Sequence, residues 1–205
     1  MNDFFKSWLK SWDRVVVYGG VFDPVHKGHI SAAEAALRYG RRVVFMPEKI
    51  PQHKHGTTDY SQRLKMLEIA TKAHDKIDVV DYPGEQQFIV PVFSWLKKQY
   101  SQSGFVWLVG SDVVDYISAW EGVDQLEELG VKSIIFFDRE GVEKPDTVQI
   151  SDTMIASKIR RPRFRKKRQK HAAMSSQSIR SNMSTHHTQL NHSVYEYIKQ
   201  NNLYK

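Results

Sequence analysis

The sequence predicts an α/β domain, with a Rossmann-like parallel sheet and helices on both faces. Three observations support this class. Short β-branched segments alternate with helical segments, two predicted strands end in glycine followed by polar residues, and a length of 205 residues suits one domain. In such sheets ligands bind beyond the carboxyl ends of the strands, where the strand order reverses. We therefore expect a phosphate-bearing ligand where the glycine-terminated strands end.

The first half of the chain alternates regularly between strands and helices. Val15–Tyr18 is a β-branched run that stops at Gly19 and Gly20, which is typical of a buried strand followed by a turn. A helix is predicted over Ile30–Tyr39, with Gly40 as its C-cap. The next predicted elements are a strand at Val43–Met46, a helix capped by Thr57, Thr58 or Asp59 that extends to Ile69 or Ala70, and a strand at Ile77–Val80.

The second half continues the alternation. The predicted elements are a helix at Phe93–Tyr100, a strand at Phe105–Val109 ending in Gly110, helical segments over Val113–Leu129, a strand at Ile134–Phe137 and a final helix containing Val194–Ile198. We expect residues 1–13 to form an N-terminal extension. Residues 14–205 then form the domain, with a basic insert at about 156–172.

Composition excludes several classes of protein. The chain has no cysteine, which excludes a disulfide scaffold, a thiol nucleophile and a thiolate zinc site. No apolar run approaches the roughly 18 residues of a membrane span. The first residues contain aromatic side chains among charges and lack the continuous apolar stretch of a signal peptide. We therefore expect a cytoplasmic protein without membrane contact.

The positive charge of the chain is concentrated in one segment. Lys158–Lys170 contains nine Lys or Arg residues and no acid, more than the formal net charge of +7 of the whole chain. The segment has two interpretations. It is either a solvated insert, or a cationic rim that gathers nucleotides or contacts nucleic acid. Phe164 is its only aromatic residue, so it offers little for stacking on single strands.

The strongest motif follows the first strand and reads GGVFDPVHKGH, from Gly19 to His29. The glycines allow close approach of backbone to a nucleotide. His26 and His29 are three residues apart, so at the start of a helix they share one face. The helix N-terminus adds free N–H groups and a positive dipole end, and two imidazoles can donate to a phosphoryl group. Histidines at this spacing could also form a metal pair or lie in a solvated loop.

The full string closely resembles the signature of the nucleotidyltransferase superfamily with an HxGH motif. Its form, with two glycines before x-Phe-Asp-Pro, resembles the bacterial nicotinate-nucleotide adenylyltransferases. The resemblance covers about residues 14–204, interrupted by the basic segment. It implies transfer of AMP from ATP to nicotinate or nicotinamide mononucleotide, with release of pyrophosphate, Mg²⁺ accompanying ATP, and neither a resident metal nor a covalent nucleophile.

On the ATP side, the resemblance extends to two further segments. Gly110-Ser111-Asp112 matches a nucleotide-binding Gly-x-Asp, and Ser175–Arg180 resembles the segment that grips the triphosphate. An earlier copy at Ile150–Ile155 lacks the arginine, so we prefer the later one. The implied catalytic residues are His26, His29 and Arg180. The implied ATP-binding residues are Gly19, Gly20, Phe22, His26, His29, Gly110, Asp112, Ser175, Ser176 and Arg180.

On the acceptor side, the resemblance implies roles for Lys54, Trp120 and Arg139. Trp120 would stack on the pyridine ring, which gains roughly 1 kcal/mol on an aromatic face. Each residue also has a plainer interpretation: Lys54 as a loop charge, Trp120 as core and Arg139 as a surface charge. The family's Ser-Tyr-Thr anchor is replaced by Gln87–Pro91, Gln177 stands where Thr is usual, and Glu121 follows Trp120 where an aromatic residue is common.

Two alternatives to a pyridine-nucleotide enzyme stay open. The chain could be a sister enzyme that transfers a nucleotidyl group to another phosphate acceptor. It could also be a non-catalytic nucleotide sensor whose basic segment binds nucleic acid, although His26 and His29 are both present.

Overall fold

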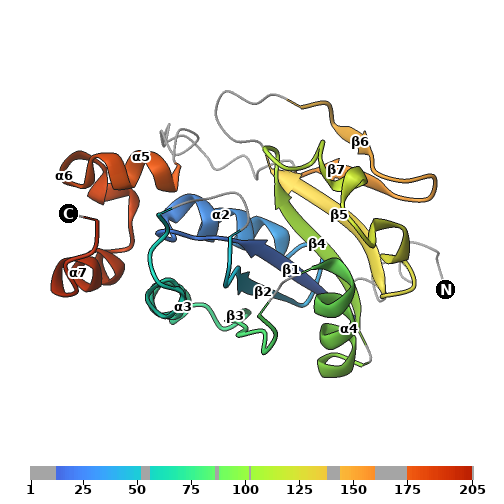
Figure 1. Ribbon diagram of the computed structural model, residues 1–205, viewed down its shortest axis with the longest axis horizontal. Helices are drawn as coiled ribbons and strands as arrows, with labels where there is room; N and C mark the ends of the chain where they lie inside the picture. The colour runs from blue at the N-terminus through green and yellow to red at the C-terminus, as the bar shows by residue number, and fades with distance from the viewer. Residues whose placement is uncertain are drawn as a thin grey trace.

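In the computed structural model, a seven-stranded and mostly parallel sheet organises the chain (Figure 1). The structure describes residues 13–51, 56–85, 88–101, 103–137, 144–159 and 175–204. The strands lie in the order β3-β2-β1-β4-β5-β7-β6, and only β6 runs antiparallel to its described neighbour. They are β1 Arg14–Gly20, β2 Arg42–Pro47, β3 Ile77–Val79, β4 Gly104–Gly110, β5 Val131–Phe137, β6 Thr147–Gln149 and β7 Ile155–Lys158.

Helices cover both faces of the sheet, because successive strand residues point to opposite sides. Val16 and Tyr18 of β1 share one core with α2, α3, α5 and α7, whereas Val15 and Val17 share the other with α4 and η1. The predicted α/β class with a Rossmann-like sheet is therefore confirmed. The helices are α2 Lys27–Ala36, α3 Tyr60–Thr71, α4 Ile89–Gln99, α5 Ser176–Ser181, α6 Met183–His186 and α7 His192–Gln200, with 3₁₀ turns η1 Ile117–Ala119, η2 Val123–Gln125 and η3 His187–Gln189.

The first predicted helix begins earlier and ends earlier than expected. It starts at Lys27, so that His29 lies in its first turn, and it ends at Ala36. Gly40 is therefore not its C-cap. A Cβ atom at Gly40 would lie 2.7 Å from the carbonyl oxygen of Arg14, so glycine is needed there for close approach to β1. Asp59, one of three proposed caps, is the N-cap of α3, although its side chain makes no capping bond.

The predicted helical segments over Val113–Leu129 are shorter than expected and are not α-helical. The structure has only the short turns η1 and η2 there, and Gly122 adopts a left-handed φ of 82° that interrupts a regular helix. The hairpin of β6 and β7 was not predicted, because its strands are only three and four residues long.

The basic insert begins later than predicted. Ala156 lies in β7 and is fully buried, and Ile159 is 4% exposed with its N–H bonded to Phe136. Residues 156–159 therefore belong to the sheet and its core. The rest of the predicted insert, from Arg160, lies outside the described residues.

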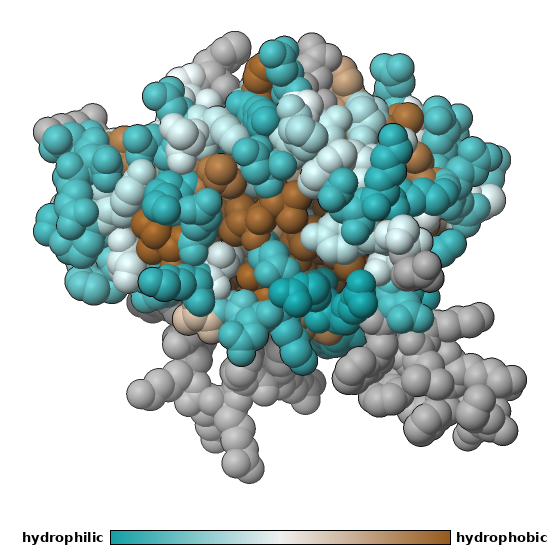
Figure 2. All heavy atoms as spheres, turned by 90° about the horizontal axis from the view of Figure 1, so that it is seen from below, coloured by the Kyte–Doolittle hydropathy of each residue, from teal (hydrophilic) through white to brown (hydrophobic). Residues whose placement is uncertain are grey.

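The surface of the described chain carries few large apolar side chains. Those that are exposed are Ile50, Phe88, Tyr116 and Ile155. Seen from below, apolar surface gathers near the centre of the molecule and polar side chains surround it (Figure 2). Among the described helices, none has the length and apolar character that crossing a bilayer requires.

Candidate active site

The strand order reverses between β1 and β4. From β1 the chain moves outward to β2 and β3 on one side, and then crosses to β4 and β5 on the other. Tyr18 of β1 is paired with Leu108 of β4, so Gly19-Gly20 and Val109-Gly110 end the two strands side by side. This is the switch point at which ligands of such sheets bind. The fold thus brings the glycine motif next to Gly110 and to the exposed Asp112.

The loop after β1 folds back over the end of its own strand. Phe22 has a left-handed φ of 52° and is 3% exposed. A Cβ atom at Gly20 would lie 3.1 Å from the Phe22 ring, so the glycine makes room for this ring. Phe22 in turn packs edge-on against His29, with ring centroids 5.0 Å apart. The aromatic packing therefore holds one imidazole in a defined place.

His26 and His29 form a stacked pair at the N-terminus of α2. Their ring centroids are 3.7 Å apart with an interplanar angle of 23°, and the two residues are 6% and 4% exposed. The helix begins at Lys27, because the carbonyl of His26 accepts the N–H groups of His29 and Ile30. Both rings thus lie where the helix dipole and the first free N–H groups favour an anion.

One hydrogen bond indicates the tautomer of the neutral His29 ring. The main-chain N–H of His26 donates to Nδ1 of His29 over 3.3 Å. Because Nδ1 accepts this bond, the proton of the neutral ring is on Nε2. A ring in this tautomer can donate a hydrogen bond from Nε2 to an oxygen that carries negative charge.

The segment Ser175–Arg180 docks on the same loop. The Ser176 hydroxyl donates to the carbonyl of Pro24 over 3.0 Å, and an Nη1 N–H of Arg180 donates to the carbonyl of Asp23. Ser175 caps α5 by accepting the N–H of Ser178 over 3.0 Å. The structure therefore brings together His26, His29, Ser176 and Arg180. The earlier copy of the motif forms instead the turn between β6 and β7, where Ile150 and Met154 are buried.

Asp23 connects this loop to three other segments. Its carboxylate is 2% exposed and accepts the N–H of Thr58 over 3.1 Å and the hydroxyl of Tyr204, the penultimate residue. Arg180 lies 3.8 Å from the same carboxylate. Sequence reasoning assigned Asp23 no partner, because these partners are distant from it in the chain.

Arg63 is a second connection that sequence reasoning missed. It is 1% exposed and donates to the carbonyls of Val21, Thr58 and Lys49 over 2.9, 2.8 and 3.2 Å. Burial lowers the pKa of its guanidinium, and the nearby carboxylates of Asp23 and Glu48 oppose this shift. Arg63 of α3 thus holds the loops after β1 and β2 against each other.

The opposite face of the sheet carries the candidate acceptor half. Trp120 is half-buried and packs on Trp107 of β4, with ring centroids 5.8 Å apart and planes at 50°. The indole Nε1 of Trp107 lies 4.0 Å from the place a Cβ would take at Gly19. Trp120 is therefore partly exposed, and its neighbour Trp107 lies close to the switch point. Lys54 and Arg139 lie outside the described residues.

The turn after Trp120 depends on Gly122. A Cβ atom at Gly122 would lie 2.5 Å from Cγ2 of Val90. Gly56 is a suitable comparison, because its φ of 66° is also positive but no atom lies within 4 Å of its Cβ position. We expect Gly56→Ala to cost about 1 kcal/mol through backbone strain, and Gly122→Ala distinctly more because the clash adds to it. Urea denaturation of both variants measures the difference. Equal losses would show that Val90 moves aside freely.

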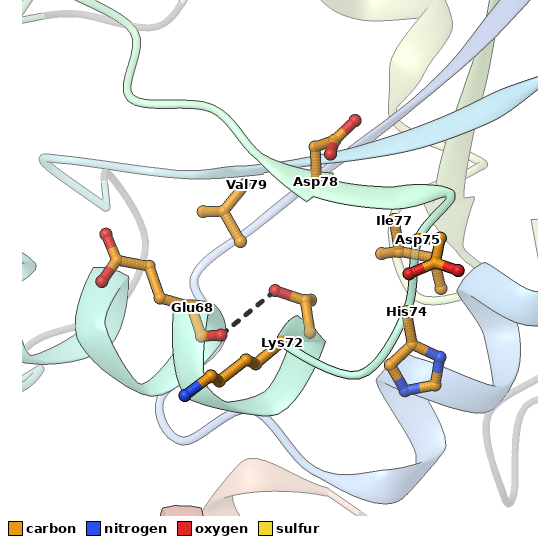
Figure 3. A pocket seen from close by; sticks show the side chains of 8 residues that line it. Glu68, Lys72, His74, Asp75, Ile77, Asp78 and Val79 are labelled. Atoms are coloured by element: carbon orange, nitrogen blue, oxygen red, sulfur yellow. Dashed lines mark hydrogen bonds between the residues drawn. The ribbon is translucent and has the colours of Figure 1, made fainter.

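A separate hollow of about 330 Å³ lies at the other end of the sheet (Figure 3). Glu68 of α3, Lys72 directly after α3, Asp75 before β3 and Asp78 within β3 contribute to its lining. Asp78 is already paired with Arg42. Ile77 pairs with Val43 near the beginning of β2, so the hollow is at the amino ends of the strands. It is remote from His26 and His29 and is not the nucleotide site.

Comparison with known proteins agrees with this fold. The family model described as cytidylyltransferase-like matches residues 17–182. The chain therefore belongs to the cytidylyltransferase-like family, whose members share this α/β nucleotidyltransferase fold.

Its relatives refine that class. A probable nicotinate-nucleotide adenylyltransferase of Shouchella clausii is 30% identical over 75% of this chain and 85% of its own. One of Listeria monocytogenes is 28% identical over 93% of this chain and 97% of its own. The structure of Plasmodium falciparum nicotinic acid mononucleotide adenylyltransferase complexed with NaAD has the same fold, with a TM-score of 0.72 at 18% identity over 94% of this chain and 97% of its own. Within the family, the chain is a nucleotidyltransferase of the nicotinate-nucleotide adenylyltransferase type.

Proposed function

We propose that this protein transfers the adenylyl group of ATP to a pyridine mononucleotide in NAD biosynthesis. A phosphate oxygen of the mononucleotide attacks the α-phosphorus of ATP in line, a new P–O–P bond forms, and the bond to the β-phosphate breaks with release of pyrophosphate. The observation that carries this proposal is the stacked pair of His26 and His29 at the start of α2, with Ser176 and Arg180 docked on the same loop.

The proposed roles follow from position and charge. His29, and His26 beside it, donate to the oxygens of the α-phosphoryl group as their negative charge grows. Arg180 and Ser176 hold the β- and γ-phosphates, while Gly19 and Gly20 let the nucleotide approach the sheet. Asp112 at the end of β4 meets the adenosine part. On the other face, Trp120 stacks on the pyridine ring, and Lys54 and Arg139 complete the acceptor half by resemblance.

Mg²⁺ would enter with ATP. In the described part of the chain, no cluster of three or more histidine, cysteine or carboxylate side chains could hold a metal ion. Mg²⁺ commonly binds through substrate phosphates and waters, so the phosphates of ATP would supply most of its ligands. The ion supplies neutralisation of charge on the phosphate chain, and the side chains above supply its orientation.

The acceptor is expected to be a pyridine mononucleotide with a weak preference for the carboxylate form. Trp120 stacks equally on acid and amide. The N-cap residue of α4 is Phe88, whose side chain has no polar atom that could anchor the carboxylate of the acceptor. Glu121 is exposed, so its repulsion of a carboxylate is worth only a few tenths of a kcal/mol. We therefore expect the ratio of kcat/KM for the acid over the amide to stay below about 1000.

An ATP-dependent pyrophosphate-release assay with both nucleotides tests this assignment. Another phosphate acceptor, such as a pantetheine phosphate, serves as the comparison. A ratio above about 1000 for the acid would reveal an anchor that the described residues do not include. Turnover only with the other acceptor would favour the sister enzyme, and no turnover at all would favour the nucleotide sensor.

A further inference from the structure

We propose that Tyr204 is a positioning residue for Arg180 and acts through the buried carboxylate of Asp23. The inference rests on the proposed function for one point only, the binding of the ATP phosphates by Arg180. It gives Tyr204, which is far in sequence from the motif containing His26 and His29, an indirect role in ATP binding.

The two carboxylate oxygens of Asp23 have separate partners. Oδ1 accepts the hydroxyl of Tyr204, and Oδ2 accepts the main-chain N–H of Thr58 over 3.1 Å. Arg180 is bonded to the main-chain carbonyl of Asp23, whereas its Nη1 is 3.8 Å from Oδ2. The guanidinium is therefore near the carboxylate but does not make a close bidentate pair with it. Its other N–H groups are donors that a phosphate can use.

The turn after α7 fixes the position of Tyr204. After α7 the N–H of Leu203 bonds to the carbonyl of Ile198 over 3.0 Å, and Asn202 and Tyr204 adopt left-handed φ values of 54° and 60°. Asparagine enters this region readily, but a tyrosine does so only when its surroundings compensate. The hydroxyl bond to Asp23 is such a compensation. The turn therefore brings the hydroxyl of Tyr204 to the carboxylate of Asp23.

The hydroxyl of Tyr204 is a permanent donor. Burial and the Asp23 carboxylate raise its pKa well above the ordinary value of a tyrosine. The group thus stays protonated throughout the pH range in which such an enzyme operates, and it keeps Oδ1 occupied. Without it, Oδ1 would lose this donor and could accept a hydrogen bond from Arg180, and the guanidinium would be withdrawn from the phosphates by a closer ion pair.

Tyr204→Phe tests the proposal, because it removes only the hydroxyl. We expect the Kd of ATP, measured by calorimetry, and the KM for ATP to rise about 5- to 10-fold, with the KM for the acceptor unchanged. Tyr197→Phe is the matched control. Its hydroxyl also ties the C-terminal region to the body of the protein, through a 2.6 Å bond to Gln62 of α3, but it does not reach Asp23. The control should bind ATP as the unmodified protein does.

A double-mutant cycle with Arg180→Ala separates positioning from general stability. If Tyr204 acts through Arg180, Tyr204→Phe will no longer change the Kd of ATP once Arg180 is alanine. An undiminished effect in that background, equal effects of Tyr204→Phe and Tyr197→Phe, or no effect of Tyr204→Phe would each overturn the proposal. Binding of ATP is read without an acceptor. Failure of the pyridine assignment would therefore leave this test intact.

Discussion

His29→Ala is expected to lower kcat by about 100-fold or more and to leave the KM for ATP within a few-fold of its original value. The orientation of this ring is the reason. Because Nδ1 accepts the N–H of His26, the neutral ring carries its proton on Nε2, and in the proposed mechanism this N–H donates to charge that develops only in the transition state. Removing one such donor typically costs two to three orders of magnitude in rate. Steady-state kinetics with ATP as the varied substrate measures both constants.

Two further variants separate chemistry from packing. His29 is 4% exposed and packs on Phe22, so its truncation also leaves a cavity, and the melting temperature must be measured beside the rate. His29→Asn retains a side-chain N–H donor and should recover part of the lost kcat. His74→Ala, at the amino end of β3, should leave kcat unchanged. A loss confined to the KM for ATP would contradict the assigned role.

The strands of the central sheet could be predicted because their burial is nearly continuous. Val15–Tyr18 and Phe105–Val109 are apolar runs rich in β-branched and aromatic residues and followed by glycine, and they lie inside the observed β1 and β4. Helix starts were predicted less well. α4 begins at Ile89 although Pro91 follows two residues later, because a proline costs little in a first turn where its N–H would have no helical partner.

The residues of the candidate site also differ in how far the sequence could predict them. Residues contiguous with the glycine motif, including His26 and His29, could be placed from sequence because one loop and one helix start carry them. The resemblance implied that Ser175–Arg180 grips the triphosphate, but it did not predict that Ser176 and Arg180 dock on Pro24 and Asp23. Asp23, Arg63 and Tyr204 could not be assigned from sequence. Their roles depend on contacts that only the folded chain brings together.

Arg63→Met should lower the free energy of unfolding by about 2–4 kcal/mol. The substitution keeps most of the length and apolar contact of the side chain but removes every donor. Three carbonyls, a buried one of Val21 and part-buried ones of Thr58 and Lys49, then lose their partner, and an unsatisfied buried group costs about 1–3 kcal/mol. The total stays below the sum because the buried cation itself carries a desolvation cost, which lowers its pKa. Urea denaturation followed by circular dichroism measures the change.

Lys65→Met is the matched control, since it places the same new side chain two residues along α3. Lys65 makes only an exposed ion pair with Glu68, at 3.0 Å, so the control should change stability by no more than about 0.5 kcal/mol. A similar small loss for Arg63→Met would mean that water reaches the three carbonyls and that Arg63 does not hold the loops together. A large loss would show that the loop bearing His26 and His29 owes its position to a cation from the next helix, and not only to the glycines and aromatic rings of the motif itself.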